Sequence, residues 1–225
     1  MKKFILFTLF FISISAISQT SITKTLGDFS VLKVYNGIDV ELIPSDKQEL
    51  VIQGEKSEKV KIKNANNTLK IYLKFPETLA NGNAKVTLYY SKNISIIDAN
   101  EGATITAKNF KQSQLDVKTQ EGAMINMVID TKHLEVKSVS GGVVKLTGTT
   151  KNQHVEVSDS GVYHGYNLVA TDASIVRAAI GGKAEVNVGE TLDAKIRFGG
   201  TIYYKGTPEV LKTKKVIGGT IEAKN

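Results

Sequence analysis

The sequence predicts an all-β solenoid, specifically a right-handed single-stranded parallel β-helix with about 20 residues in each coil. Three observations support this fold class. Glycines recur at a nearly fixed spacing, short segments alternate apolar and polar residues, and no stretch after the N-terminal 18 residues has the 3.6-residue periodicity of an amphipathic helix.

The glycine period begins near residue 94, and successive members are separated by 18 to 21 residues. The series consists of Gly102, Gly122, Gly142, Gly161, Gly182, Gly200 and Gly219. A unit of this length cannot bury its apolar side alone, whereas stacked units share one core and hydrogen-bond to each other. We therefore expect each glycine to mark a corner where the backbone turns sharply.

Other solenoids fit the sequence less well. The leucine-rich-repeat consensus is missing, and the coil length varies too much for a left-handed hexapeptide helix.

The apolar positions shift by one residue relative to the glycines between the early and the later coils. They are Ala123 and Ile125 in an early coil, but Val144 and Leu146 in the next. Because a one-residue slip would turn a strand over, we expect the corner to absorb this shift.

Residues 1–18 are typical of a secretory signal peptide, with Lys2 and Lys3 before a short apolar run and a small-residue site ending at Ser18. A retained membrane anchor is the alternative. Residues 19–225 then form one domain, with less regular rungs over 19–93 and glycine-cornered coils over 94–225. The absence of cysteine excludes disulfides, thiol catalysis and acylation at a cysteine.

The chain is basic, with a formal net charge of +7. Its lysines are scattered, and Arg177 and Arg197 are its only arginines. Nucleic-acid-binding proteins usually gather arginine and aromatic residues on one face, so we expect no nucleic-acid partner. The charge is typical of a solvated surface that attracts acidic polymers weakly.

The segments 29–42, 50–54 and 67–71, together with the Ser-Gly and Gly-Gly corners of the second half, resemble the putative auto-transporter adhesin head domain, or GIN domain, of Bacteroidota. The resemblance covers residues 27–223. Glu101-Gly102 and Glu121-Gly122 depart from the small-residue pair that the family often has. The resemblance implies a right-handed β-helix similar to pectin-lyase-like folds, no recognised catalytic residues, and adhesion.

Equivalent residues of stacked coils lie about 4.8 Å apart, so side chains form columns. The central residues of the Leu-x-Val segments predict one outward column: Asp116, Glu135, Glu156, Arg177, Asp193 and Lys212. Three successive carboxylates could bind Ca²⁺. The alternative is a ladder of ion pairs with Lys118 and Lys137, because opposed like charges destabilise a sheet.

A second outward column is predicted to contain Lys145, His164, Glu185, Tyr203 and Glu222. With Tyr163 and Tyr166 nearby, this column could stack against sugars, although such a column is more often ordinary alternation of surface polarity. The three histidines have no metal-ligand spacing, and no catalytic motif or cofactor fingerprint is present.

These features favour a non-enzymatic, adhesin-like or structural binding module of the cell envelope, with a glycan or envelope partner and no cofactor. It would be located in the periplasm, on the outer-membrane surface or outside the cell. The alternative is a polysaccharide lyase or hydrolase, for which Arg177 beside Glu156 is the only candidate pair. End-to-end self-association is a further possibility, because no cap follows Ile221.

Overall fold

The computed structural model describes residues 21–80 and 82–224, so the predicted signal peptide lies outside the described residues. The described chain is almost entirely β-structure with one short 3₁₀ helix, η1 (Ser57–Lys59). Its strands are β1 (Ile22–Thr25), β2 (Val31–Val34), β3 (Asp39–Pro44), β4 (Glu49–Gln53), β5 (Val60–Ala65), β6 (Thr68–Leu73), β7 (Lys85–Tyr90), β8 (Ile96–Ala99), β9 (Thr104–Lys111), β10 (Gln114–Thr119), β11 (Met124–Asp130), β12 (His133–Ser138), β13 (Val143–Val157), β14 (Val162–Ala179), β15 (Lys183–Val188), β16 (Thr191–Arg197), β17 (Thr201–Lys205), β18 (Val210–Lys215) and β19 (Thr220–Ala223).

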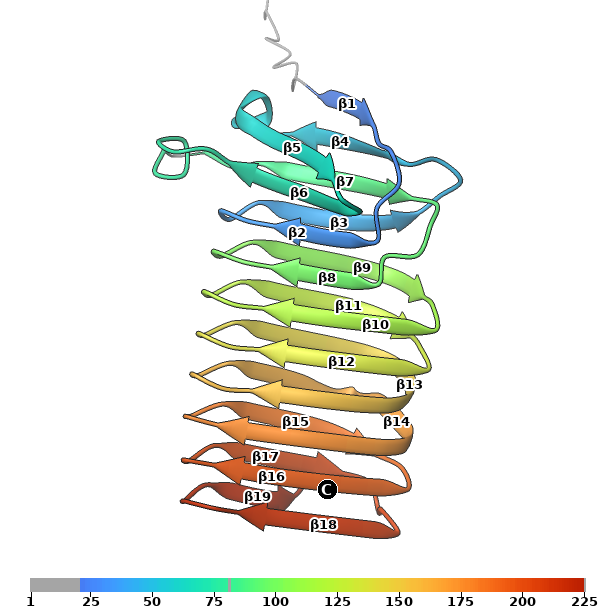
Figure 1. Cartoon of the computed structure of the whole chain (residues 1–225), viewed down its shortest axis with the longest axis vertical. Helices are drawn as coiled ribbons and strands as arrows, with labels where there is room; N and C mark the ends of the chain where they lie inside the picture. The colour runs from blue at the N-terminus through green and yellow to red at the C-terminus, as the bar shows by residue number, and fades with distance from the viewer. Residues whose placement is uncertain (1–20, 81, 225) are drawn as a thin grey trace, which may run out of the picture.

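These strands form a solenoid of about seven turns with roughly 19 residues each, which confirms the predicted fold class. Strands such as β8 run to the left on the near side and strands such as β9 run to the right behind them while the chain descends, so the coil is right-handed (Figure 1). Each coil contributes one strand to each of two sheets. We call the outer surface of the β8–β10–β12–β16–β18 sheet the first face, and that of the β9–β11–β15–β17–β19 sheet the second face. The long strands β13 and β14 bend from the second sheet into the first.

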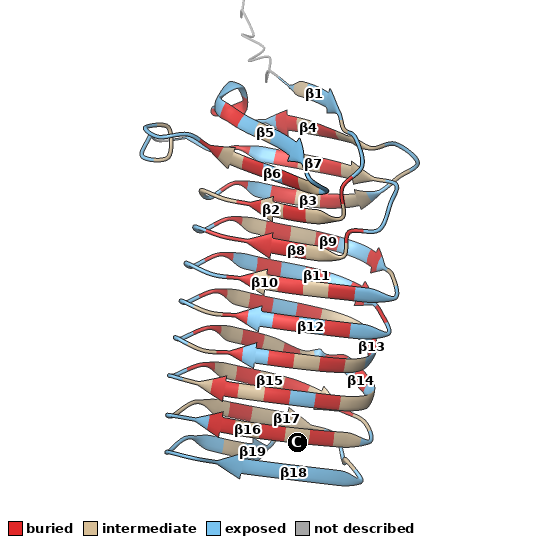
Figure 2. Cartoon of the chain, in the orientation of Figure 1, coloured by how far each residue is buried: buried red, intermediate tan, exposed pale blue. Residues whose placement is uncertain are grey.

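The core lies between the two sheets and is built from stacks of inward side chains. One stack joins Val117, Val136, Val155 and Val176 through the parallel register of the first sheet, and all four side chains are buried. Figure 2 shows the resulting alternation of buried and accessible positions along most strands. In the described residues no buried side-chain nitrogen or oxygen lacks a hydrogen-bond partner. The predicted period-2 alternation therefore defines the core.

The corners are turns with two consecutive residues in the left-handed region, where φ is positive. Glu121-Gly122 and Ser140-Gly141 have this conformation, with φ of 55° and 72° in the first pair and 50° and 73° in the second. Glycine is favoured there because other residues incur steric strain at positive φ. The turn glycine is therefore Gly141 and not Gly142, which corrects the corner series from the third coil onwards. The glutamate–glycine corners have the same geometry as the others.

The glycine that follows the turn at Gly142, Gly161 and Gly182 has a different cause. Gly142 and Gly161 follow Ala123 in the ladder between coils, and a Cβ at Gly161 would lie 2.0 Å from the Ser138 carbonyl oxygen. The predicted one-residue shift is consequently wrong, because Ile125 and Val144 are direct partners in the register. The coils stay in register, and only the choice of glycine made them look displaced.

The N-terminal part is a cap that the sequence did not predict. The β2–β3 rung lies between the β6–β7 rung and the β8–β9 rung, so the stacking order departs from the chain order. Above it, β4 pairs antiparallel with β7, β1 pairs antiparallel with β4, and β5 pairs antiparallel with β6 (Figure 1). The antiparallel strands cover the N-terminal end of the parallel stack.

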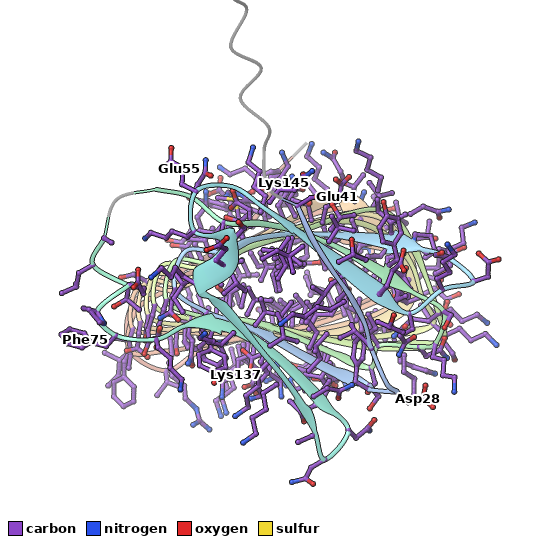
Figure 3. The ribbon with its side chains drawn as sticks, turned by 90° about the horizontal axis from the view of Figure 1, so that it is seen from above. Asp28, Glu41, Glu55, Phe75, Lys137 and Lys145 are labelled. Atoms are coloured by element: carbon purple, nitrogen blue, oxygen red, sulfur yellow. The ribbon has the colours of Figure 1, made fainter. Side chains whose placement is uncertain are left out.

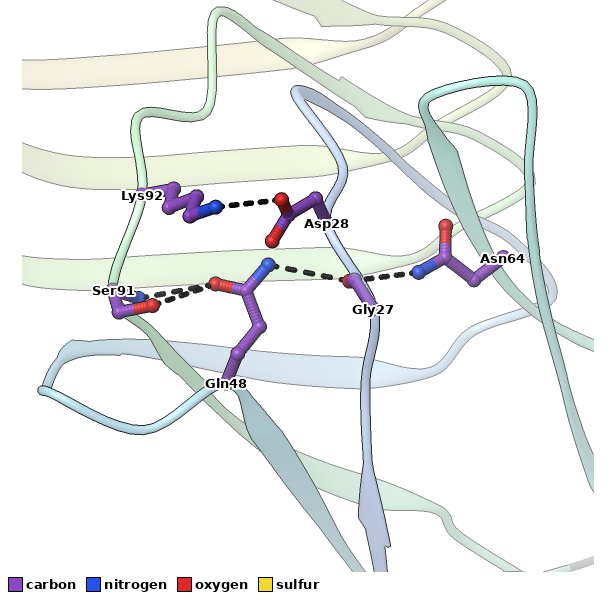
Figure 4. A network of polar contacts seen from close by, with 6 residues as sticks. All are labelled: Gly27, Asp28, Gln48, Asn64, Ser91 and Lys92. Carbon is purple, nitrogen blue, oxygen red and sulfur yellow. Dashed lines mark hydrogen bonds and ion pairs between the residues drawn. The ribbon is translucent and has the colours of Figure 1, made fainter.

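A polar network fastens the segment between β1 and β2 across this cap (Figure 4). The Gly27 carbonyl oxygen accepts hydrogen bonds from Asn64 at 2.8 Å and from Gln48 at 3.3 Å. Gln48 also accepts a hydrogen bond from Ser91, and Lys92 pairs with Asp28 at 2.6 Å. Four chain segments that are distant in sequence are thereby held together.

At the C-terminal end, β18 pairs only with β16 and β19 only with β17 in the described chain. Every residue of β18 is exposed (Figure 2). This rung carries Lys212, Lys214 and Lys215, whose charges would oppose each other if two copies met edge to edge. End-to-end association therefore stays a prediction from the sequence.

The two kinds of glycine predict different responses to substitution. Gly161→Ala should lower the free energy of unfolding by about 3 kcal/mol, because its methyl group would overlap backbone of the preceding coil. Gly141→Asn should cost about 1 kcal/mol or less, since asparagine tolerates positive φ and no atom lies within 4 Å of the new Cβ. Urea unfolding measures both values, and equal losses would contradict the assignment.

Candidate functional site

The first face carries two columns where one was predicted. Asp116 pairs in register with Glu135, but the next members of that column are His154 and Ile175, followed by Asp193 and Lys212. Glu156 and Arg177 lie two residues further along their strands, in a column with Lys118, Lys137 and Lys195. The predicted single column is therefore wrong at Glu156 and Arg177.

His154 lies between two carboxylates that were expected to be direct neighbours. Its Nδ1 is 2.9 Å from Glu135, and its Nε2 is 3.7 Å from Glu156. Among the described residues, no group of three or more histidine, aspartate or glutamate side chains is arranged to hold a metal ion. His154 and Ile175 thus interrupt the expected row of carboxylates, and Ca²⁺ binding stays a prediction.

Arg177 is fixed by contacts to the coil below it. Its guanidinium Nη1 donates to the Asp193 carboxylate at 2.8 Å and to the Asp193 carbonyl oxygen at 2.9 Å. This diagonal ion pair joins the two columns. Among the described residues Lys118 and Lys137 form no ion pair, so the predicted ladder through these lysines does not form.

A groove of about 650 Å³ crosses the first face in the C-terminal half of the solenoid. We call it the basic groove. Its charged and titratable lining residues come from successive coils, and they are Lys137, His154, Glu156, Arg177, Lys195 and Arg197. Four cations thus face one carboxylate and one histidine. Because the lining crosses several coils, the groove extends along the solenoid axis and suits an elongated anionic ligand.

The second predicted column lies on the opposite face, and the register places its members as expected. Lys145, His164, Glu185, Tyr203 and Glu222 are successive partners. Figure 3 looks along the solenoid and shows Lys145 with Glu41 on one side and Lys137 on the other. The two predicted binding surfaces therefore cannot contact one small ligand together.

Ion pairs and aromatic contacts occupy much of this second column. Glu185 lies 2.7 Å from His164 Nδ1 and 2.6 Å from Lys183 Nζ. The Tyr203 ring has the Lys183 and Lys224 ammonium groups 5.6 and 4.7 Å from its centroid, respectively. Burial works against the charge on Glu185, but hydrogen bonds from Lys183 and His164 outweigh it and lower the pKa below the ordinary 4.5.

Tyr166 belongs to the same surface. Lys205 lies 4.9 Å from its ring centroid, and burial, with nearby carboxylates, raises the pKa of Tyr166 to about 12. Tyr166 and Tyr203 therefore each have a lysine against the ring. The sugar-stacking role of this column stays a prediction.

Tyr163 is not a surface residue, which corrects its assignment to this column. Its side chain is completely buried, because it takes the inward position occupied by Val144 in the coil above. The hydroxyl donates to Gln153 Oε1 at 3.1 Å, and Gln153 Nε2 donates to Ser174 at 2.9 Å. This network places polar side chains in the core at positions where other coils carry leucine.

Sequence reasoning missed Lys195, Arg197 and His154 as parts of one surface. The signal available was the arginine count, because both arginines of the chain line the basic groove. The sequence alone does not show that Glu156 and Arg177 lie two residues further along their strands than Glu135, because this offset is known only from the register between coils.

No helix in the described part of the chain is long and apolar enough to span a membrane.

The stacked coils and their two lateral faces define a right-handed β-solenoid. Residues 28–208 match the family described as putative auto-transporter adhesin, head GIN domain, and the chain belongs to this family. This confirms the resemblance found in the sequence. None of the curated proteins compared with the chain matches it in sequence.

Several solved structures are similar in fold. A putative adhesin of Bacteroides fragilis is 21% identical with a TM-score of 0.82, and the alignment covers 92% of this chain and 98% of that one. A putative lipid binding protein of Parabacteroides distasonis is 19% identical with a TM-score of 0.71, covering 92% and 97%. A putative adhesin of Parabacteroides merdae is 18% identical with a TM-score of 0.61, covering 92% and 96%. At these identities the likeness shows the fold alone.

The buried network predicts a cost for removing one hydroxyl. Tyr163→Phe should lower the free energy of unfolding by about 1–2 kcal/mol, because Gln153 Oε1 loses its donor inside the core. Tyr203→Phe on the surface is the matched control and should change it by less than about 0.5 kcal/mol. Urea unfolding that gives the same small change for both variants would contradict the network.

The Glu185 contacts predict a pH-dependent contribution to stability. Because the folded-state pKa is lowered, the contribution is present above the unfolded value near 4.5 and is lost as pH falls through the folded value. Glu185→Gln should therefore destabilise the protein by about 0.5 kcal/mol at pH 7 and by much less at pH 3. Unfolding by urea at both pH values is the measurement, and an equal loss at the two would contradict the ion pairs.

Proposed function

We propose that this protein is a non-enzymatic, adhesin-like binding module of the cell envelope that holds an acidic glycan in the basic groove. The observation that carries the proposal is the composition of the groove, in which Lys137, Arg177, Lys195 and Arg197 face a single carboxylate. Cationic side chains of this kind form charge-assisted hydrogen bonds with carboxylate or sulfate groups. Family membership supports an exported or surface location and a binding role.

The orientation of the groove supports a polymeric ligand. Its lining comes from β12, β13, β14 and β16, so equivalent positions repeat at the spacing of the coils, about 4.8 Å. Arg177 is already held in place by Asp193, which reduces the side-chain entropy lost when an anion binds. A chain of acidic sugars could therefore contact several coils at once.

The lyase or hydrolase alternative has one favourable observation. Glu156 and Arg177 are register partners in the groove, and His154 lies 3.7 Å from Glu156. A carboxylate, a histidine and a cation beside a polymer groove are groups that such an enzyme uses. The binding experiment below also measures this reaction.

Polygalacturonate and its methyl ester are matched probes, because esterification removes the charge and keeps the backbone of the polymer. We expect calorimetry to show binding of polygalacturonate that weakens with salt, and little binding of the ester. Lys195→Gln combined with Arg197→Gln should weaken binding about tenfold, because two exposed charge contacts of up to about 1 kcal/mol each are lost.

Lys145→Gln is the control, since this exposed lysine lies on the opposite face (Figure 3). Binding that is equal for the polymer and its ester, or equal in the groove variant and the control, would refute the groove as the site. Release of unsaturated uronate during the titration would instead establish the lyase alternative.

A further inference from the structure

The turns at the corners align along one edge of the solenoid, which we call the turn edge. The first residue of each turn lies on this edge, and in chain order these residues are Asn36, Glu101, Glu121, Ser140, Asp159, Ile180, Phe198 and Ile217. All of them except Ile217 are in the left-handed region. Ile217 takes this place because its carbonyl oxygen accepts from Gly199, just as that of Ile180 accepts from Ser160. The edge is polar over the upper coils and apolar over the last three.

The three apolar residues form a continuous ridge, since their coils are adjacent and hydrogen-bonded. Their exposed fractions are 55% for Ile180, 62% for Phe198 and 57% for Ile217, and the neighbouring Val216 is 51% exposed. Ile180, Phe198, Val216 and Ile217 are called the apolar ridge below. They contribute little to the core, so burial within the chain does not explain their hydrophobicity.

Backbone conformation makes two of these residues more unusual. Ile180 and Phe198 have φ of 47° and 51°, a region that bulky and β-branched side chains rarely adopt. Asparagine fits the same conformation well and occupies the equivalent place at Asn36, with φ of 61°. Residues held in such strain without a packing role point to a function outside the fold.

Positive charge gathers around the ridge. Residues 174–225 contain nine lysines and arginines against five carboxylates, so most of the excess charge after residue 18 lies in the last coils. Arg197 directly precedes Phe198, and Lys195 and Lys214 are register partners on the same face. Lys183 follows the Ile180 turn on the other side. Apolar tips are therefore flanked by cations on both faces.

We propose that the apolar ridge docks on an anionic lipid membrane. The ridge is a narrow row of turn tips and not a groove, a shape that suits insertion between lipid headgroups. Its flanking cations would then lie at the level of the phosphates, where each adds to the attraction. The proposal concerns the edge of the solenoid; it shares Lys195 and Arg197 with the basic groove but does not require a glycan to bind there.

The chain contains no tryptophan, so a single tryptophan reports directly on the ridge. We expect the emission of Phe198→Trp to shift to the blue with vesicles of phosphatidylcholine and phosphatidylglycerol, and not with phosphatidylcholine alone. Glu121→Trp occupies the equivalent turn position in the polar part of the edge and should show no shift. No shift of Phe198→Trp with anionic vesicles would overturn the proposal.

A second variant separates membrane binding from folding. Ile180, Phe198 and Ile217 are replaced together by asparagine. Asparagine suits the left-handed backbone of Ile180 and Phe198, and Ile217 is exposed, so the thermal midpoint should be equal or higher while co-sedimentation with anionic vesicles falls at least tenfold. Unchanged sedimentation of this variant would refute membrane docking. So would a concentration-dependent blue shift of Phe198→Trp without lipid, which would show that a second copy covers the ridge.

Discussion

The geometry of the solenoid depends on one steric constraint at the turn edge. The coils between Glu101 and Gly199 reverse through two consecutive left-handed residues, and in the later ones the next residue then lies against the backbone of the coil above. That next position is Ile38 in the β2–β3 rung, alanine at Ala103 and Ala123, and glycine in the later coils. Because this contact recurs in the glycine-containing coils, it fixes where their strands begin and so keeps the columns in register through the C-terminal half of the stack.

The constraint explains what could be predicted and where prediction failed. The glycine period identified the fold class, but Gly141 and Gly142 are glycines for different reasons, positive φ in one case and lack of space in the other. A sequence shows the pair and not the reasons. The second-face column was predicted correctly because it lies a fixed few residues after the turn, where no irregularity intervenes.

Both errors in the predicted surfaces come from one buried network. In the core position of Leu115 and Leu134, the next two coils carry Gln153 and Ser174. These polar residues hide the Leu-x-Val pattern, so Val155-Glu156-Val157 was aligned two residues out of place. The partner that makes a buried Gln153 tolerable is the Tyr163 hydroxyl, which the sequence pattern placed outside. A polar residue in the core interrupts the alternation of apolar and polar residues from which a strand's inward face is predicted. Its hydrogen-bond partner lies on another strand, so the sequence of its own strand does not show that it is buried.

The N-terminal cap could not be predicted because its antiparallel pairs and the inserted β2–β3 rung join strands that are far apart in the sequence, and no local pattern indicates which strands will pair. The cap also gives the molecule two unlike ends. It closes the stack with a polar network at Gly27 and Gln48. The basic groove, the tyrosine–lysine contacts and the apolar ridge all lie towards the other end. An open sheet edge can pair with another chain, and the cap covers that edge at the N-terminal end. The lateral surfaces tolerate varied side chains since each coil is fixed by its turn. The recognition surfaces can therefore differ between coils without changing the register that positions them.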